Sequence, residues 1–84
     1  MNYYVYILEC ADTTLYVGIT TDLTRRVQEH NTSPKGAKYT KARRPVVLSY
    51  FEEFKNRSEA SKREYELKKM KREEKLRLLQ SKAR

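Results

Sequence analysis

The first twenty residues contain two short runs of apolar and aromatic positions. Residues 3–8 and 15–20 are rich in strand-forming side chains, and each run is too short to form a helix. A polar turn made of Ala11, Asp12 and Thr13 separates the two runs. This pattern predicts an antiparallel β-hairpin at the start of the chain.

The spacing of apolar residues becomes helical after the hairpin. Leu23, Val27 and His30 follow one another at intervals of four and three residues, and Asp22 before them is a suitable N-cap. The pattern predicts a helix that ends within residues 31–35, a segment that contains a Ser-Pro pair.

The second half of the chain is predicted to alternate between loop, strand and helix. Residues 36–44 form a basic loop, and residues 46–51 form a third strand. Asn56 followed by Glu59 resembles a capping box and opens a helix. A second helical stretch follows at residues 72–79, after a bend between the two.

The resulting order, β-β-α-β-α-α, predicts an α+β fold. A three-stranded sheet, at least partly antiparallel, is expected with helices packed on it. The length of 84 residues suits one small domain over residues 1–84. Residues 80–84 are expected to be a frayed basic tail.

The distribution of charge points to a polyanionic partner. The formal net charge is +8, of which residues 1–54 carry only +1 and residues 55–84 carry +7. Within residues 1–54, five of the cations lie in a run of ten residues that contains no acid: Lys35, Lys38, Lys41, Arg43 and Arg44. Such side chains release counterions when they contact phosphates, so this segment is a candidate nucleic-acid surface. The alternative is a solvated basic surface that keeps the protein soluble.

Composition excludes several other classes of protein and site. No run approaches the roughly 20 apolar residues of a membrane span. No basic residues precede the apolar start, as they would in a secretion signal, so a cytoplasmic protein is expected. One Cys and one His cannot supply a zinc site of ordinary ligand count. With only two glycines, Gly18 and Gly36, the chain lacks a glycine-rich phosphate loop.

The hairpin is expected to bring tyrosines together. A turn centred near residue 11 places Tyr6 opposite Tyr16 on one face, with Tyr4 opposite Gly18 as the next pair. A glycine inside a strand often marks a place where a ligand or another backbone comes close. The alternative is ordinary aromatic packing across the strands.

Two basic side chains of the first helix share its apolar side. Arg26 and His30 are four residues apart and lie on the same side as Leu23 and Val27, so both are expected to face the sheet or its rim. An Arg held beside tyrosine hydroxyls could clamp a phosphate, because its planar fork donates two hydrogen bonds at once. The alternative is an Arg that extends past the rim to solvent.

Glu64 is the acidic residue whose position is most informative. It lies between Ala60 and Leu67 on the helical face that should meet the sheet, where a carboxylate needs a partner. One candidate partner is a cation, Arg26 or Arg63, in a salt bridge. The other is a divalent ion such as Mg²⁺, which often takes only one or two protein carboxylates.

These residues together resemble the GIY-YIG nuclease superfamily. Residues 4–6 (Tyr-Val-Tyr) and 16–18 (Tyr-Val-Gly) are similar to the paired motifs that name it. Arg26 falls ten residues after the second motif's Tyr, His30 follows four later, and Glu64 matches the position of the family's metal-binding Glu. The similarity covers about residues 3 to 70, and small stand-alone bacterial members, usually described as uncharacterised, are most alike.

The resemblance implies a three-stranded antiparallel sheet flanked by helices, and metal-dependent cleavage of phosphodiester bonds. Carried onto this chain, it implies that Tyr6 or Tyr16 activates or aligns the attacking water, and that Arg26 stabilises charge on the phosphate. His30 would assist proton transfer or orientation. Glu64 would hold one Mg²⁺ or Mn²⁺.

The chain departs from the family pattern at two points. Tyr4 stands where the first motif has its Gly, and no Asn follows Asn56, although many active members carry a late Asn in the site. DNA, with branched or damaged structures included, is the implied substrate, and RNA is a second candidate. The alternatives are a non-catalytic nucleic-acid binder on the same scaffold and a module that docks on a protein partner.

Overall fold

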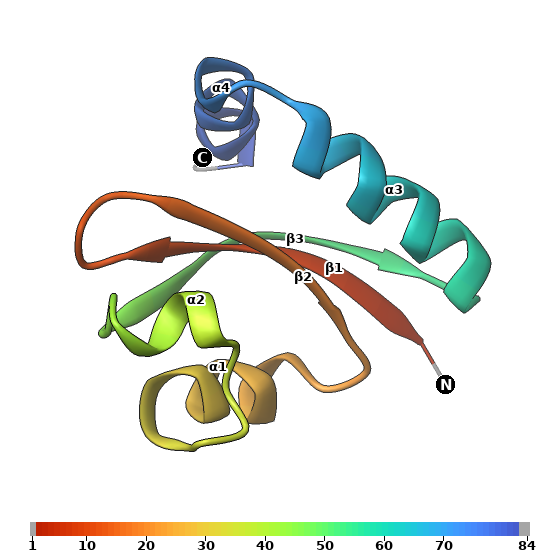
Figure 1. Ribbon diagram of the computed structural model, residues 1–84. Coiled ribbons are helices and arrows are strands. Elements are labelled where there is room, and N and C mark those ends of the chain that lie inside the picture. Colours follow the sequence, from red (N-terminus) through yellow and green to blue (C-terminus); the bar gives the residue numbers. More distant parts are fainter. Residues whose placement is uncertain (1, 83–84) are drawn as a thin grey trace.

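Three strands form one antiparallel sheet at the centre of the computed structural model, which describes residues 2–82 (Figure 1). They are β1 (Tyr3–Cys10), β2 (Leu15–Thr20) and β3 (Val46–Phe54), arranged in the order β2-β1-β3. The central strand β1 pairs antiparallel with both neighbours. The predicted α+β architecture and the element order are therefore confirmed.

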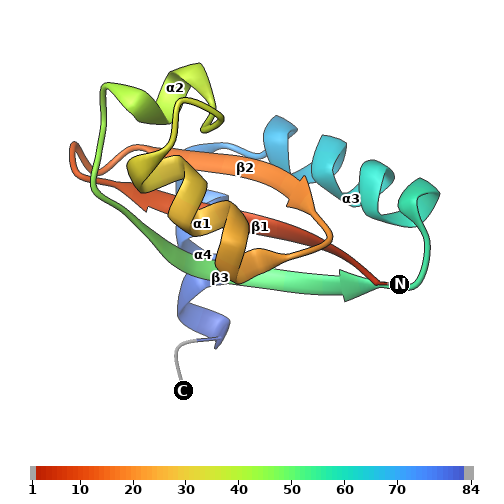
Figure 2. The ribbon, with the colours of Figure 1, turned by 90° about the horizontal axis from the view of Figure 1, so that it is seen from below.

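The helices form one layer on each face of the sheet. In Figures 1 and 2, α1 (Leu23–Thr32) and α2 (Lys38–Lys41) lie on one face, while α3 (Arg57–Lys69) and α4 (Arg72–Lys82) lie on the other. The edge strand β2 runs between α1 and α3 (Figure 2). None of the helices described in residues 2–82 is long and apolar enough to cross a bilayer.

Both predicted N-caps are present. The Asp22 carboxylate accepts a hydrogen bond from the Arg25 amide at 3.1 Å, and the Asn56 side chain accepts one from the Glu59 amide at 2.9 Å. Each cap satisfies an amide that has no partner inside its helix, which typically stabilises a protein by about 1 kcal/mol. The side-chain amide of Asn56 also donates to the Glu59 carboxylate at 3.3 Å, so the two predicted residues contact each other through their side chains.

Several predicted element boundaries differ from the structure, beginning with β1, which extends to Cys10 and not only to Leu8. The segment predicted as a basic loop contains the single helical turn α2, and β3 continues three residues beyond the predicted end at Phe51. Helix α4 continues to Lys82, through part of the tail that was expected to fray. Residues 83–84 lie outside the described residues. Backbone pairing with β1 explains the longer β3, because Glu52 and Glu53 interrupt the apolar pattern before Phe54 packs against the core.

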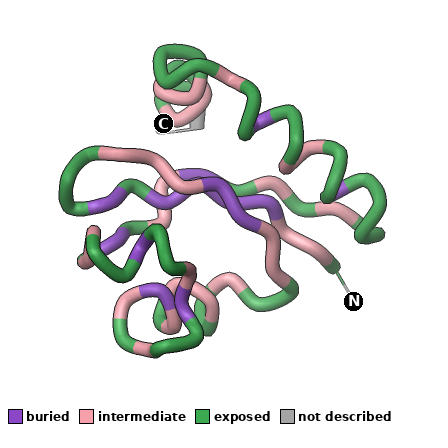
Figure 3. The backbone as a smooth tube through the Cα atoms, in the orientation of Figure 1, coloured by how far each residue is buried: buried purple, intermediate pink, exposed green. Residues whose placement is uncertain are grey.

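Alternating side chains of β1 supply two separate hydrophobic clusters. Val5 and Ile7 face α3, whereas Tyr6, Leu8 and Cys10 face α1. All five are buried, so β1 carries the core on both of its faces (Figure 3). Burial of this kind is the main term that stabilises a chain of this size.

The hairpin register differs from the predicted one by two residues. Tyr6 pairs with Gly18, and Tyr16 pairs with Leu8, so the expected pairs Tyr6–Tyr16 and Tyr4–Gly18 were wrong. The turn is centred near residue 12, one residue further along the chain than predicted, and Thr13 adopts a positive φ of 69° within it. A shift of two residues keeps every side chain on its face, so Tyr6 and Tyr16 still share the face toward α1.

Candidate active site

The hydroxyl of Tyr6 lies at the centre of the candidate site. Tyr6 is only 1% exposed, and its Oη is 2.9 Å from Nε2 of His30. Gly18 pairs with Tyr6 on the neighbouring strand. A Cβ added to it would lie 2.4 Å from the same Oη, closer than Cβ atoms in protein structures approach non-bonded atoms. Gly18 is therefore needed for the Tyr6 side chain to extend across the edge strand.

His30 is a fully buried neutral imidazole. Its Nε2 contacts Tyr6, and its Nδ1 lies 2.9 Å from Oγ1 of Thr40. Burial, together with the positive charges of Arg26 and Arg44, lowers the pKa of His30 to about 4. The ring is consequently uncharged at neutral pH and can act through a lone pair or an N–H group.

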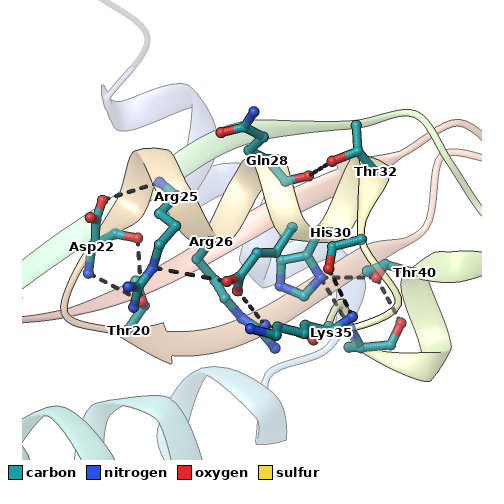
Figure 4. A network of polar contacts seen from close by, with 12 residues as sticks. Thr20, Asp22, Arg25, Arg26, Gln28, His30, Thr32, Lys35 and Thr40 are labelled. Carbon is teal, nitrogen blue, oxygen red and sulfur yellow. Dashed lines mark hydrogen bonds and ion pairs between the residues drawn. The ribbon is translucent and has the colours of Figure 1, made fainter.

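Arg26 lies beside the Tyr6 hydroxyl, on the sheet side of α1 as expected. Burial raises the pKa of Tyr6 to about 12, while a hydrogen bond from the Arg26 side chain acts in the opposite direction. The guanidinium also donates to the Glu29 carboxylate and to the Lys35 carbonyl, both at 2.9 Å (Figure 4). Its neighbour Arg25 is 68% exposed, compared with 26% for Arg26.

Tyr16 joins the site through its ring. The ring centroid is 5.3 Å from that of His30, and the ring stacks on Tyr39 at 5.8 Å. The electrostatic interaction with Tyr16 is also one of the influences that raise the pKa of Tyr6. Tyr4 is turned elsewhere, because its ring meets Phe51 edge-on at 6.1 Å.

Glu64 approaches the site from the opposite helical layer. Its side chain is 22% exposed, and its negative charge is among the causes that raise the pKa of Tyr6. The salt-bridge partner is neither of the two arginines considered from the sequence. Its carboxylate instead pairs with Lys68 at 3.3 Å, one turn further along α3. Arg26 and Arg63 pair with other acids.

The donor set around Glu64 suits a hydrated hard cation. Residues 2–82 contain no group of three His, Cys, Asp or Glu side chains that could hold a metal together. A partly exposed single carboxylate matches Mg²⁺ or Mn²⁺ that keeps waters and adds phosphate oxygens. The residues present therefore fit one such ion bound through Glu64.

The four predicted nucleic-acid-binding cations have different surroundings. Lys38 and Lys41 are exposed on α2. Arg43 pairs with Asp12 at 3.0 Å and lies over the Tyr39 ring at 4.0 Å. The fourth, Arg44, is occupied by backbone carbonyls.

Arg44 closes the C-terminal end of α1. Its guanidinium donates to the carbonyls of His30 at 2.5 Å and Ser33 at 2.6 Å. These carbonyls lack partners within the helix, so the side chain stabilises the last turn. No sequence signal marks this role, because the carbonyls that Arg44 meets belong to a segment eleven to fourteen residues away.

Comparison with known proteins gives a consistent picture. The profile of the GIY-YIG catalytic domain matches residues 2–77. A UPF0213 protein of Desulfotalea psychrophila is 60% identical over 68 residues, which are 81% of this chain and 62% of that protein. A UPF0213 protein of Staphylococcus haemolyticus is 52% identical over 94% of this chain and 95% of its own length.

Two solution NMR structures are also similar to this one. A UPF0213 protein of Bacillus halodurans is 48% identical with a TM-score of 0.63, covering 98% of this chain and 86% of that one. A protein of E. faecalis is 44% identical with a TM-score of 0.65, covering 96% and 85%. These experimental neighbours share the three-stranded sheet and its helices.

Proposed function

This chain belongs to the GIY-YIG family of catalytic domains, a nuclease superfamily, and we propose that it is itself a divalent-metal-dependent nuclease that hydrolyses phosphodiester bonds in DNA. The names of its UPF0213 relatives state no activity, so the proposal depends on the site. The observation that carries it is the meeting of His30 and Arg26 at the buried Tyr6 hydroxyl, within electrostatic reach of Glu64.

In the proposed reaction a water molecule attacks phosphorus and the bond to the leaving sugar oxygen breaks. The Tyr6 oxygen aligns this water and receives its proton, because it is the polar atom on which the other groups converge. Arg26 binds the phosphate through its fork and stabilises the charge that develops in the transition state. Neutral His30 holds the Tyr6 oxygen in position.

Glu64 is the residue proposed to hold the metal ion. When bound, Mg²⁺ or Mn²⁺ would polarise the phosphate and stabilise the leaving oxygen. The carboxylate also has a cost in the absence of an ion, since it would repel the phosphate that Arg26 attracts. A protein that only bound nucleic acid would gain nothing from this arrangement.

A cleavage assay tests the proposal directly. Single-stranded, duplex and branched DNA, with the matching RNAs, would be incubated with the protein in Mg²⁺, in Mn²⁺ or in EDTA. We expect cleavage of at least one DNA in the presence of metal and none in EDTA. A protein that binds these substrates with salt-dependent affinity yet leaves all of them intact in either metal would be a binder, and the nuclease proposal would fail.

The exposed lysines near α2 are proposed to track the DNA backbone. Three of them can be replaced together by Ala without touching the carbonyl cap of Arg44: Lys35, Lys38 and Lys41. The slope of log affinity against log salt should flatten by about three at most, since each phosphate contact contributes about one unit. DNA binding measured by fluorescence anisotropy across a salt series gives this slope.

A matched control removes the same charge from the opposite face of the sheet. The control replaces three exposed cations by Ala. Lys71 directly precedes α4, and Arg72 and Arg77 lie within it. The control variant should keep the slope of the unaltered protein. An equal change in both variants would mean that net charge alone governs binding, and would remove α2 from the proposed interface.

A further inference from the structure

The imidazole of His30 joins two buried groups from different elements. Nε2 lies 2.9 Å from Oη of Tyr6, and Nδ1 lies 2.9 Å from Oγ1 of Thr40. Tyr6 is 1% exposed, and His30 and Thr40 are fully buried. Because these three side chains are almost fully buried, their polar atoms depend mainly on one another for hydrogen bonds.

A third contact fixes which ring nitrogen carries the proton. The backbone amide of Ala37 points at Nδ1 with an N···N distance of 3.4 Å, and a backbone amide can only donate. Nδ1 must therefore accept. The Thr40 hydroxyl lies 2.9 Å from the Ala37 carbonyl as well, but that carbonyl already receives the amides of Thr40 and Lys41. Because Nδ1 is an acceptor, the single hydroxyl proton of Thr40 serves Nδ1, and the Ala37 carbonyl keeps its two amide donors.

The chain path that delivers these donors depends on Gly36. A Cβ at this position would lie 2.7 Å from the Glu29 carbonyl and 2.9 Å from Cα of His30. Without a side chain, the segment before α2 lies directly against the last turn of α1. The Thr40 hydroxyl, drawn in Figure 4, and the Ala37 amide thereby both reach Nδ1 of His30.

We propose that Thr40 is a positioning residue that holds His30 in the tautomer with its proton on Nε2, so that this N–H donates to the Tyr6 oxygen. The Tyr6 oxygen then receives the Nε2–H of His30, and the nearby guanidinium of Arg26 acts to lower the pKa of Tyr6. Both favour its phenolate form, because hydrogen bonds to a charged group stabilise that group. The assignment of the tautomer stands on geometry alone, whereas its catalytic consequence rests on the proposed function.

This tautomer determines which group loses a proton and which group gains one during the reaction. Tyr6 first loses its own proton to solvent, and the phenolate then takes the proton of the attacking water. The imidazole keeps its proton throughout and serves as a fixed donor. This differs from a mechanism in which His30 accepts the tyrosine proton, for which Nε2 would have to be bare.

A single experiment separates the two tautomers, because His30 is the only histidine in the chain. Nitrogen-15 NMR of the intact protein at neutral pH should show Nε2 protonated and Nδ1 unprotonated. A spectrum with the proton on Nδ1 would overturn the proposal. This readout is independent of activity, so the proposed function could fail in the cleavage assay while the tautomer stands, or the reverse.

Two variants of Thr40 test its own contribution. Thr40→Val keeps the shape and removes the hydroxyl, so the second tautomer should become populated in the spectrum. With cleavage as a second readout, kcat should fall on the order of tenfold with KM unchanged, the pattern of an interaction lost in the transition state. Thr40→Ser restores the donor and should restore the spectrum. A valine variant with the unaltered tautomer would show that Thr40 does not set it.

Discussion

Replacing Arg26 with alanine should lower the rate of DNA cleavage by about 10²- to 10³-fold, the usual cost of losing one preorganised donor to developing charge. Its guanidinium is held by the Glu29 carboxylate and the Lys35 carbonyl, and it reaches the Tyr6 hydroxyl. DNA affinity should change much less, because many other cations contribute to it. Single-turnover cleavage and equilibrium binding on the same substrate separate the two quantities.

The neighbouring residue supplies the control for this change. Arg25 has the same charge on the same helix, but its side chain is mostly solvent-exposed. Arg25→Ala should behave as a surface substitution. Equal losses at the two positions would mean that α1 contributes only general positive charge. Arg26→Lys adds a further test, since a point charge without the planar fork should recover only part of the rate.

Replacing Glu64 with glutamine should abolish cleavage and also abolish the stabilisation of the protein by Mg²⁺. A ligand that binds only the folded state raises the melting temperature by mass action, and this increase disappears when its site is removed. Glutamine keeps the shape of the side chain and removes its charge. Thermal melts with and without Mg²⁺, beside the cleavage assay, give both results.

In the absence of metal, the Glu64→Gln variant should have nearly the same free energy of unfolding as the unaltered protein. The ion pair between Glu64 and Lys68 is partly exposed, so its loss should cost only about 0 to 1 kcal/mol. Glu66→Gln is the matched control, because this carboxylate lies on the same helix, is 62% exposed, and pairs with Arg63. The metal assignment would be refuted if Mg²⁺ still raised the melting temperature of the Glu64→Gln variant and the variant still cleaved DNA.

The sequence predicted the faces of the elements better than their exact pairing. Strand alternation and helical spacing depend on local geometry, so Tyr6, Tyr16, Arg26 and His30 were correctly expected on one side of the sheet. The register of the hairpin was predicted two residues out because it depends on how many residues the turn uses. The positive φ of Thr13 has no reliable signal in the sequence.

Partners that come from distant segments could not be predicted. Arg44 appears in the sequence as one more cation in a basic run, and Thr40 as a polar residue within it. Their roles arise only when α2 lies against the end of α1. The pairing of Glu64 with Lys68 is different, since the interval of four residues was visible in the sequence and could have been predicted.

The position of Tyr6 in the central strand ties the chemistry of this protein to its global unfolding. Most enzymes place reacting groups on loops that open locally at low cost. Here the hydroxyl that we propose as the reacting group belongs to a strand that is paired on both sides and buried on both faces. Because β1 must separate from both neighbouring strands before Tyr6 is released, we expect amide exchange at Tyr6 and loss of the site geometry to require unfolding of the sheet.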